Sequence, residues 1–280
     1  MQVGFFFWPY TPELCERLAQ RADRYGYAMI GIADTPGNAM DPWVSAAIVA
    51  RSCRRARVAI CVTNLLSRHP AVSAAAIASL DDLANGRAVL GIGAGNSGTK
   101  NVGLAKSRPH ELADGVIFIK TLLRGEPATL AGATAHLPWV KRAPPVFLAA
   151  SHPKPLQVAG RTAEGVFVNY GLGADNIRDS HVSILAGGKG GGRAADDLEI
   201  WQVAALDCND DRDLARNRVG AMLAFLAGYV IGNKHLERAA CLRHCARSSS
   251  NCTPATARAL ATPTSSSSRS SDFSTISRGG

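Results

Sequence analysis

Short apolar runs alternate with longer segments of helical spacing along most of the chain. Each apolar run is nearly continuous, which is typical of parallel strands that helices cover on both faces. We expect strands at Val3–Pro9, Met29–Asp34, Arg57–Asn64, Ala88–Gly95, Val146–Ser151, Gly165–Gly171 and Leu198–Cys208. The pattern therefore predicts repeated β-then-α units.

The segments between these strands carry helix signals. Thr11-Pro12-Glu13 combines a capping residue, a first-turn proline and an acid at the positive helix end, and Asn85-Gly86 is a stop signal. Helices are expected from Thr11 and over Pro42–Cys53, Pro70–Asn85, Pro109–Arg124, Pro153–Ala163, Ala174–Ala186 and Asp211–Ile231. Ala128–Leu137 reads as a small inserted hairpin.

Seven such units fit either an open doubly wound sheet or a closed (β/α)8 barrel of the TIM type, which needs about 250 residues and eight strands. The number of units favours the barrel. After residue 233 the chain is rich in serine and shows no clear eighth strand. We therefore expect a barrel domain over residues 1–233, a missing or irregular eighth unit, and a low-complexity basic tail over residues 234–280.

Composition supports a folded protein that contains no membrane span. The 280 residues are 46% hydrophobic and 19% charged, which supplies enough apolar side chain for a large core. Seven cysteines, an odd number spread over a long chain, argue against a disulfide framework and favour a reducing cytoplasm. The longest apolar runs fall short of the roughly 20 residues that a spanning helix needs.

The formal charge of +9 raises the question of a nucleic-acid partner. Residues 234–280 hold seven Lys/Arg against two Asp/Glu, so much of the excess lies in the tail. No helix-turn-helix, zinc finger or basic stripe interleaved with aromatic residues accompanies it. A solvated basic tail is the simpler interpretation, and we expect no nucleic-acid partner.

In a parallel barrel the chemistry lies where strands end. Asp34 closes an apolar run in which a carboxylate has no packing role, so it is a candidate for binding a ligand or tuning a proton donor. Capping of the following loop, Thr35-Pro36-Gly37, explains it equally well.

Gly91-Ile92-Gly93-Ala94-Gly95 places three glycines at alternate positions at the end of the fourth strand. A flat ring or a phosphate can approach such a backbone closely, although tight barrel packing is an alternative. A dinucleotide-binding loop is not expected, because the next clear helix begins only near Pro109.

Ser151-His152-Pro153-Lys154 leads into a helix whose first N–H groups would suit an anion such as phosphate. The simpler alternative is a capping serine, with Lys154 as ordinary surface charge.

Three further signals are weak. Gly187-Gly188-Lys189-Gly190 lacks the Ser or Thr of a phosphate loop and reads as a flexible loop, and His110-Glu111 lacks the second histidine of a zinc protease. Cys241, Cys245 and Cys252 lie in the tail without a second spaced pair, so we expect no metal site.

Several blocks resemble the luciferase-like monooxygenase family in order and spacing, over about residues 3–208. The blocks are Arg57–Val72, Ala78–Gly95, Ala149–Lys154, Ala159-Gly160 and Glu164-Gly165-Val166. Members of this family are (β/α)8 barrels that bind FMN or the deazaflavin coenzyme F420 at the mouth and transfer hydride or activate oxygen there. The resemblance thus implies an F420- or FMN-dependent oxidoreductase acting on a small organic substrate.

The resemblance also implies a set of site residues. Thr63 and Asn64 would lie at a bulge behind the ring, where members often carry a cis peptide bond, and Ser151 with His152 would hold the phosphate. The implied cofactor-binding residues are Asp34, Thr63, Asn64, Ala94, Gly95, Asn96, Ser151, His152 and Gly171. Of these, Asp34 and Asn96 are the candidates for catalysis.

Two departures from the family pattern affect the mechanism. Oxygen-activating members usually carry histidine where this chain has Asp34-Thr35-Pro36, and some deazaflavin reductases carry an acid where it has Asn96. The chain is more similar to the methylenetetrahydromethanopterin-reductase-like branch, which favours hydride transfer. The tail, in contrast, does not resemble the family's last unit, and we hypothesise that it is not the family's own.

An FMN-dependent monooxygenase and a non-catalytic flavin-binding barrel are the alternatives to a hydride-transferring enzyme. A basic nucleic-acid-binding protein is a third. We expect a cytoplasmic protein, and a homodimer is an option because an unfinished barrel exposes apolar surface.

Overall fold

The computed structural model describes residues 1–193 and 197–228. Seven strands of the described chain form one sheet in which every neighbouring pair is parallel, in the order β1-β2-β3-β4-β7-β8-β9. Their bounds are β1 Gly4–Phe7, β2 Met29–Ile32, β3 Arg57–Asn64, β4 Ala88–Gly93, β7 Val146–Ala150, β8 Gly165–Val168 and β9 Glu199–Gln202. The predicted parallel sheet is confirmed.

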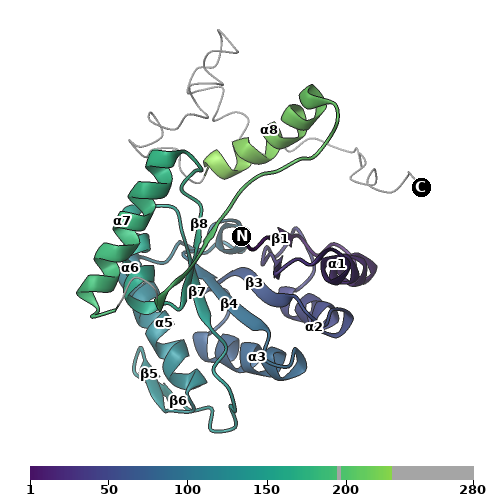
Figure 1. Cartoon of the computed structure of the whole chain (residues 1–280). Helices are drawn as coiled ribbons and strands as arrows, with labels where there is room; N and C mark the ends of the chain where they lie inside the picture. Colours follow the sequence, from purple (N-terminus) through teal and green to yellow (C-terminus); the bar gives the residue numbers. More distant parts are fainter. Residues whose placement is uncertain (194–196, 229–280) are drawn as a thin grey trace. The chain divides into compact units, whose positions relative to one another are not determined.

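Helices connect the strands and cover the outer side of the sheet, as the open arc of helical ribbons around the central strands shows (Figure 1). Their bounds are α1 Pro12–Tyr25, α2 Pro42–Ser52, α3 Pro70–Leu83, α4 Ser97–Lys100, α5 Pro109–Leu123, α6 Pro153–Thr162 and α7 Ala174–Gly190. At the start of α1, Thr11 Oγ1 accepts the backbone N–H of Leu14, and Pro12 lies in the first turn, as the sequence signals predict.

The sheet curls on itself, so that its two faces have separate cores. One cluster lies inside the curl, with one buried residue each from β2, β3, β4, β7 and β8: Met29, Ala59, Val89, Phe147 and Phe167. A second, larger cluster packs the outer face of the sheet against the helices. The (β/α) barrel predicted from the strand pattern is confirmed.

Contacts across the interior hold the curl together. The Arg57 guanidinium, on the third strand of the sheet, lies 2.7 Å from a carboxylate oxygen of Glu199 on the seventh. The guanidinium also lies over the Phe147 ring, 5.2 Å from its centroid, and Trp201 Nε1 donates to Glu199 at 2.6 Å. A Cβ atom on Gly4 would lie 3.3 Å from the Trp201 ring, so β1 and β9 approach each other.

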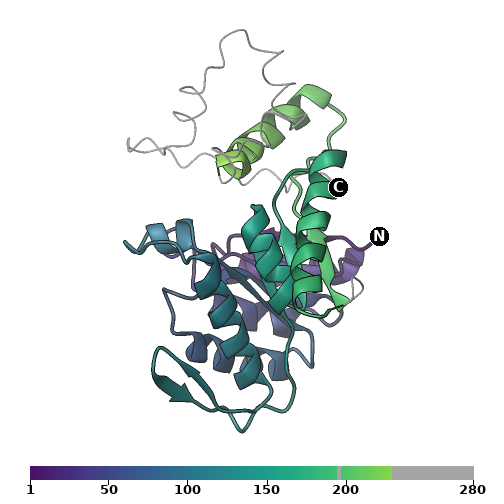
Figure 2. The same cartoon turned by 90° about the vertical axis from the view of Figure 1, so that its left-hand side faces the viewer.

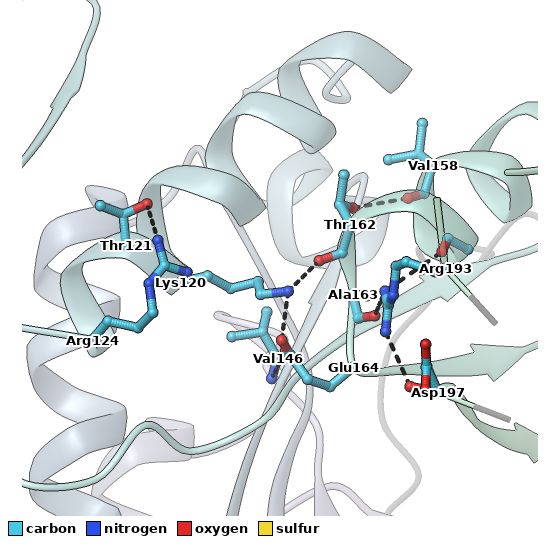
Figure 3. Close-up of polar contacts among 11 residues, drawn as sticks. Lys120, Thr121, Arg124, Val146, Val158, Thr162, Ala163, Glu164, Arg193 and Asp197 are labelled. Atoms are coloured by element: carbon cyan, nitrogen blue, oxygen red, sulfur yellow. Dashed lines mark hydrogen bonds and ion pairs between the residues drawn. The ribbon is translucent and has the colours of Figure 1, made fainter. Parts of the chain in front are cut away.

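A second polar network stabilises the end of the sheet where β7 and β8 begin (Figure 3). Lys120 Nζ lies 2.5 Å from Glu164 Oε1 and donates to the carbonyl of Thr162 at 2.6 Å. The other Glu164 oxygen accepts the N–H of Val146, the first residue of β7, at 2.9 Å. Because the expected site lies at the opposite ends of the strands, this network has a structural role.

The predicted hairpin is present as β5 (Ala128–Leu130) and β6 (Ala133–Ala135), a separate antiparallel pair. It joins the end of α5 to the start of β7 and therefore lies at the strand-start end of the sheet (Figure 2). The hairpin therefore lies away from the strand ends where the site is expected.

Two local predictions were wrong. The glycine-rich stretch from Gly187 to Gly190 belongs to helix α7, not to a flexible loop. A Cβ on Gly187 would lie 1.9 Å from the Gln157 carbonyl oxygen, and one on Gly160 would lie 2.0 Å from that of Ile184. These glycines therefore allow α6 and α7 to pack backbone against backbone, and that packing compensates for the low helix propensity of glycine.

The second wrong prediction concerns the glycine run of β4. The short helix α4 follows it almost at once, whereas we expected the next helix only near Pro109. Four residues that include Ser97 and Gly98 carry no helical periodicity, which is why the pattern did not show it.

The chain divides into two units, residues 1–204 and the segment from residue 205 onward. Described residues of the second unit include α8, Arg212–Gly228, whose first turn is capped by Asp211 Oδ1 accepting the N–H groups of Asp213 and Leu214. The predicted boundary at residues 233/234 and the expected irregular eighth unit lie outside the described residues.

Candidate functional site

The ends of β2, β3, β4, β7 and β8 lie at one rim of the curled sheet, because these five strands are parallel and adjacent in this order. We call this rim the mouth. Every predicted site residue lies at the very end of one of these strands or within three residues after it: Asp34, Thr63, Asn64, Ala94, Gly95, Asn96, Ser151, His152 and Gly171. The sequence thus predicted correctly that they share one end of the barrel.

Asp34 and Thr63 form the centre of the mouth. The Thr63 hydroxyl donates to Asp34 Oδ2 at 2.6 Å, and Thr63 is only 1% exposed. Burial raises the pKa of the Asp34 carboxyl above its usual value, and the hydrogen bond from Thr63 opposes that shift only in part. The carboxyl can therefore hold a proton at a higher pH than an ordinary aspartate.

Charges from the loops after β2 and β3 surround this pair. Arg68 donates to Asp41 Oδ2 at 3.0 Å and lies over the Trp43 ring, 5.6 Å from its centroid. The negative charge of Asp41 raises the pKa of Asp34 further, whereas the positive charge of Arg68 lowers it. Sequence analysis did not single out Arg68, because an arginine in a polar loop carries no distinguishing pattern.

The side-chain amide of Asn64 stabilises the turn after β3 by hydrogen bonds. Asn64 Oδ1 accepts the backbone N–H groups of Leu66 and Ser67 at 2.9 and 2.8 Å, and Nδ2 donates to the Ser67 hydroxyl at 2.9 Å. The side chain therefore shapes the mouth and has little capacity left for a ligand.

Directly before Thr63, the peptide bond between Cys61 and Val62 is cis. The pairing of β3 with β4 shifts between Ile60 and Thr63, which is a bulge. The resemblance placed the cis bond and the bulge at Thr63-Asn64, and both lie just before it.

After β4 the chain turns back over the ends of β2 and β3. Gly95 has φ +88°, a conformation that side chains rarely adopt, and the Asn96 carbonyl accepts the N–H of Lys100 at 2.7 Å. A Cβ on Gly98 would lie 2.8 Å from the Asp34 carbonyl oxygen and 3.4 Å from Asn64 Nδ2. The segment after β4 thus covers the Asp34 backbone closely, and this requires glycine at position 98.

Ser107 closes the base of this segment, where its N–H donates to the Ala94 carbonyl at 2.7 Å. Its hydroxyl is buried and has no hydrogen-bond partner within residues 1–193 and 197–228. Buried polar groups are rarely left unpaired, so this hydroxyl is a candidate donor to a ligand at the end of β4. A serine in a polar loop gave no signal in the sequence.

The start of α6, expected to bind an anion, offers few backbone donors. His152, not Ser151, is the N-cap residue. The first three helix residues include Pro153 and Pro155, which have no N–H, so Lys154 alone supplies a free backbone donor there. Binding of an anion at the start of α6 would therefore depend mainly on side chains, including the Ser151 hydroxyl and the Lys154 ammonium.

The start of α7, next along the mouth, offers more backbone N–H donors than the start of α6. Gly171 has φ +94°, and Gly173 is the N-cap, with no side chain bonded to the first-turn N–H groups. The first-turn residues Ala174, Asp175 and Asn176 all carry an N–H. The predicted residue Gly171 thus lies beside the better set of backbone donors.

The described residues contain no group of three or more His, Cys, Asp or Glu side chains that could hold a metal ion. Within the same residues, no helix is long and apolar enough to cross a membrane.

Comparison with known proteins decides the family. The sequence profile of the family described as luciferase-like monooxygenase matches residues 11–265. The chain belongs to this family. The match continues past residue 233 and so includes part of the tail that we expected to be foreign to the family.

Relatives of this luciferase-like chain are oxidoreductases. It is 27% identical over 237 residues to the 5,10-methylenetetrahydromethanopterin reductase of Methanolobus tindarius, covering 81% of this chain and 71% of the relative. The F420-dependent hydroxymycolic acid dehydrogenase of Mycobacterium tuberculosis is 29% identical over 233 residues, which are 76% of this chain but 63% of that enzyme. The expected class, a luciferase-like oxidoreductase, is confirmed.

The fold is shared with a solved reductase. The coenzyme F420-dependent tetrahydromethanopterin reductase of Methanopyrus kandleri superposes with a TM-score of 0.73 at 22% identity, covering 84% of this chain and 74% of that structure.

Proposed function

We propose that this chain is a deazaflavin-dependent oxidoreductase that transfers hydride between coenzyme F420 and a small organic substrate at the mouth. The observation that carries the proposal is the hydrogen bond between buried Thr63 and half-buried Asp34 at the strand ends of a luciferase-like barrel similar to F420-dependent enzymes. FMN, which the resemblance also allows, is the competing cofactor.

The chemistry of the mouth fits such a group. A flat ring with polar edges needs close access to backbone and a few directed donors and acceptors. The glycine-rich end of β4, the unpaired Ser107 hydroxyl and the Asp34 carboxyl supply these. The negatively charged phosphate would lie where Ser151, Lys154 and the first turn of α7 offer donors.

Each residue has a separate task in this proposal. The cofactor supplies the hydride chemistry when bound, and the protein binds and orients it and excludes water. Asp34, whose pKa is raised by burial, is placed to exchange a proton with the polar edge of the ring or with the substrate. Thr63 fixes the orientation of that carboxyl, and Asn96 lies at the β4 end as a neutral polar contact.

A titration of the full chain with coenzyme F420 and with FMN, followed by visible absorbance, tests cofactor binding. We expect saturable binding of F420 and weaker binding of FMN. Preference for FMN would assign the chain to the monooxygenase alternative, and binding of neither would refute a redox function.

A second experiment tests catalysis. Reduced F420 is mixed anaerobically with a panel of small carbonyl and imine compounds, and the return of the oxidised cofactor's absorbance is followed. Loss of a general acid typically costs about 100-fold or more, so Asp34→Ala should abolish turnover while F420 still binds. Asp82→Ala, on the exposed face of α3, is the control. Turnover by no compound, despite F420 binding, would favour the non-catalytic barrel.

A further inference from the structure

The inner face of the mouth is aromatic on the side of β1. Phe5 and Phe7 pack on the outer core, so the alternation of side chains turns Phe6 and Trp8 to the inner face. Their two rings meet edge to face, with centroids 5.7 Å apart. We call Phe6 and Trp8 the aromatic wall. The function proposed above gives these two side chains no task.

The neighbouring strand shows the same orientation of the wall. A Cβ on Gly31 of β2 would lie 2.8 Å from the Cβ atoms of both Phe6 and Cys61. Cys61 packs on the cluster inside the curl, and Phe6 therefore lies on the same side of the sheet.

Two hydrogen bonds hold the aromatic wall beside the loop that carries Asp34. Trp8 Nε1 donates to Thr35 Oγ1 at 3.3 Å, and Thr35 directly follows Asp34 in the chain. One residue after Trp8, the Pro9 carbonyl accepts the N–H of Met40 at 3.0 Å, near the other end of the same loop. The indole is therefore fixed next to the residue to which we assign proton exchange.

The rings of the aromatic wall are only partly covered. Phe6 and Trp8 are half-buried although they face inwards. β9, which approaches β1, adds Trp201 and Val203 to the inner face, and these side chains are half-buried as well. Small-molecule sites are lined mainly by such apolar and aromatic side chains. The wall therefore leaves apolar surface on which a substrate can pack.

The described strands offer no free positive charge to a substrate at this surface. Arg57 is the only Lys, Arg or His in the seven strands of the described sheet. Its Nη1 donates to both carboxylate oxygens of Glu199, at 2.7 and 2.8 Å, and its guanidinium lies over the Phe147 ring. A phosphate or carboxylate on a substrate would be buried against the wall without a partner from the strands, and such burial is costly.

We propose that the aromatic wall selects the substrate, which is an uncharged compound with an apolar ring next to its carbonyl or imine group. This inference rests on the hydride-transfer function proposed above. The ring of the substrate packs against Phe6 and Trp8, edge to face or offset-stacked, and the reacting group then lies towards Asp34.

Binding of a matched series of ketones tests the inference. The full chain is saturated with oxidised F420, which has no hydride to give, and is titrated by calorimetry with acetone, acetophenone and a carboxylated acetophenone. We expect acetophenone to bind about 10- to 100-fold more tightly than acetone, the gain from burying an apolar ring. The added carboxylate should weaken binding by about 10-fold or more.

Two variants of the wall sharpen the test. Trp8→Arg replaces the indole with a cation, so carboxylated acetophenone should bind more tightly than acetophenone, a reversal that misfolding cannot produce. Phe6→Leu keeps apolar volume but removes a ring, and should weaken acetophenone binding by about 3- to 10-fold while acetone changes by less than about 2-fold. Trp139→Ala, an exposed tryptophan in the segment before β7, is the control and should change none of the affinities.

Turnover gives an independent measurement. With reduced F420 in place of the oxidised form, acetophenone should be reduced with a higher kcat/KM than acetone. Each turnover gives the secondary alcohol and oxidised F420, because the carbonyl carbon gains one hydride and its oxygen one proton.

The outcomes separate this inference from the proposed function. If F420 binds but the wild type shows equal affinity for acetone and acetophenone, the wall does not select the substrate and the redox function stands. A preference that is unchanged in both Trp8→Arg and Phe6→Leu would have the same meaning. Failure of F420 to bind would overturn both.

Discussion

At the scale of single residues, the Asp34 carboxyl is a candidate functional group, and burying it lowers the stability of the folded chain. The carboxyl is partly desolvated at the mouth, and within the part of the chain that the structure describes it accepts a hydrogen bond from Thr63. Such groups commonly mark functional sites, because a packing role alone would be filled by an apolar residue. The sequence predicted Asp34 as a candidate because a carboxylate followed an apolar run, but it left loop capping equally open. In the structure the carboxyl accepts a hydrogen bond from Thr63, and its role in a ligand site stays a prediction.

We expect Asp34→Asn to be more stable than the wild type at pH 7. Burial raises the folded-state pKa of Asp34 above its unfolded value, so the folded chain binds more protons between these two values. The stabilising contribution of the protonated carboxyl is present below the unfolded pKa, about 3.9, and is lost as pH rises through the folded pKa.

Calorimetric melting temperatures measured from pH 3.5 to 8 check this expectation. The advantage of Asp34→Asn should grow with pH over the titration and shrink towards acid pH, while exposed Asp82→Asn should show no such trend. A wild type that melts above Asp34→Asn at pH 7 would contradict the burial argument.

We expect Thr63→Val to lose about 1.5–3 kcal/mol of the free energy of unfolding at pH 7. Valine keeps the shape but removes the donor to a half-buried carboxylate, which costs more than an ordinary hydrogen bond. Urea unfolding measures the loss. Thr129→Val is the control, because its hydroxyl bonds to Thr134 in the exposed hairpin; a similar small loss in both variants would show that the Asp34–Thr63 bond is unimportant.

At the scale of elements, the apolar runs predict where the strands lie, but they do not predict how long the strands are. Met29–Asp34 and Gly165–Gly171 were predicted as strands, but β2 ends at Ile32 and β8 at Val168. One residue beyond each strand still pairs with its neighbour, since the N–H groups of Ala33 and Asn169 donate to Phe7 and Ala150, and the chain then bends into the mouth loops. An apolar run indicates that residues are buried, whereas a strand also needs a neighbouring strand to pair with. The local pattern therefore overestimates the length of the strand.

The packing of α6 against α7 gives a prediction at this scale. Gly187→Ala and Gly160→Ala should each destabilise the fold by about 1–3 kcal/mol, because a Cβ would meet a backbone carbonyl within 2.0 Å in either case. Chemical denaturation measures the loss. Gly190→Ala in the same helix has nothing within 4 Å of its Cβ and should be neutral or stabilising by up to about 1 kcal/mol. Equal effects at all three positions would refute close helix packing as the reason for the glycines.

At the scale of the whole molecule, polar contacts at the strand starts hold the curl and leave the strand ends free for chemistry. The Arg57–Glu199 pair joins residues 142 positions apart in the sequence, and the Lys120–Glu164 pair anchors β7 to α5. This division of roles between the two ends is the usual one in parallel barrels. The oligomeric state and the cytoplasmic location stay predictions.

A double-mutant cycle on Arg57→Met and Glu199→Gln measures the contribution of the cross-barrel pair. We expect a coupling free energy of about 1–2 kcal/mol, reduced from that of a fully buried pair because the side chains are 28% and 39% exposed. The exposed pair Arg178–Asp175 is the control and should couple by no more than about 0.5 kcal/mol. Equal couplings would show that the interior pair does not stabilise the curl.

The sequence by itself determined the order of β and α units, the parallel sheet and the rim at which the polar residues gather. These follow from local patterns, because apolar runs, capping residues and chain direction fix which ends of the strands share a side. Only the tertiary structure decided that Asp34 pairs with Thr63, that the Asn64 amide is taken up by its own turn and that Gly187 lies inside a helix. The Asp34–Thr63 pair and the place of Gly187 against Gln157 join residues that are distant in the sequence, and neither hydrogen-bond partners nor backbone clearance have a period along a chain. The Asn64 turn is local, but its polar residues alone do not show which groups their side chains bond.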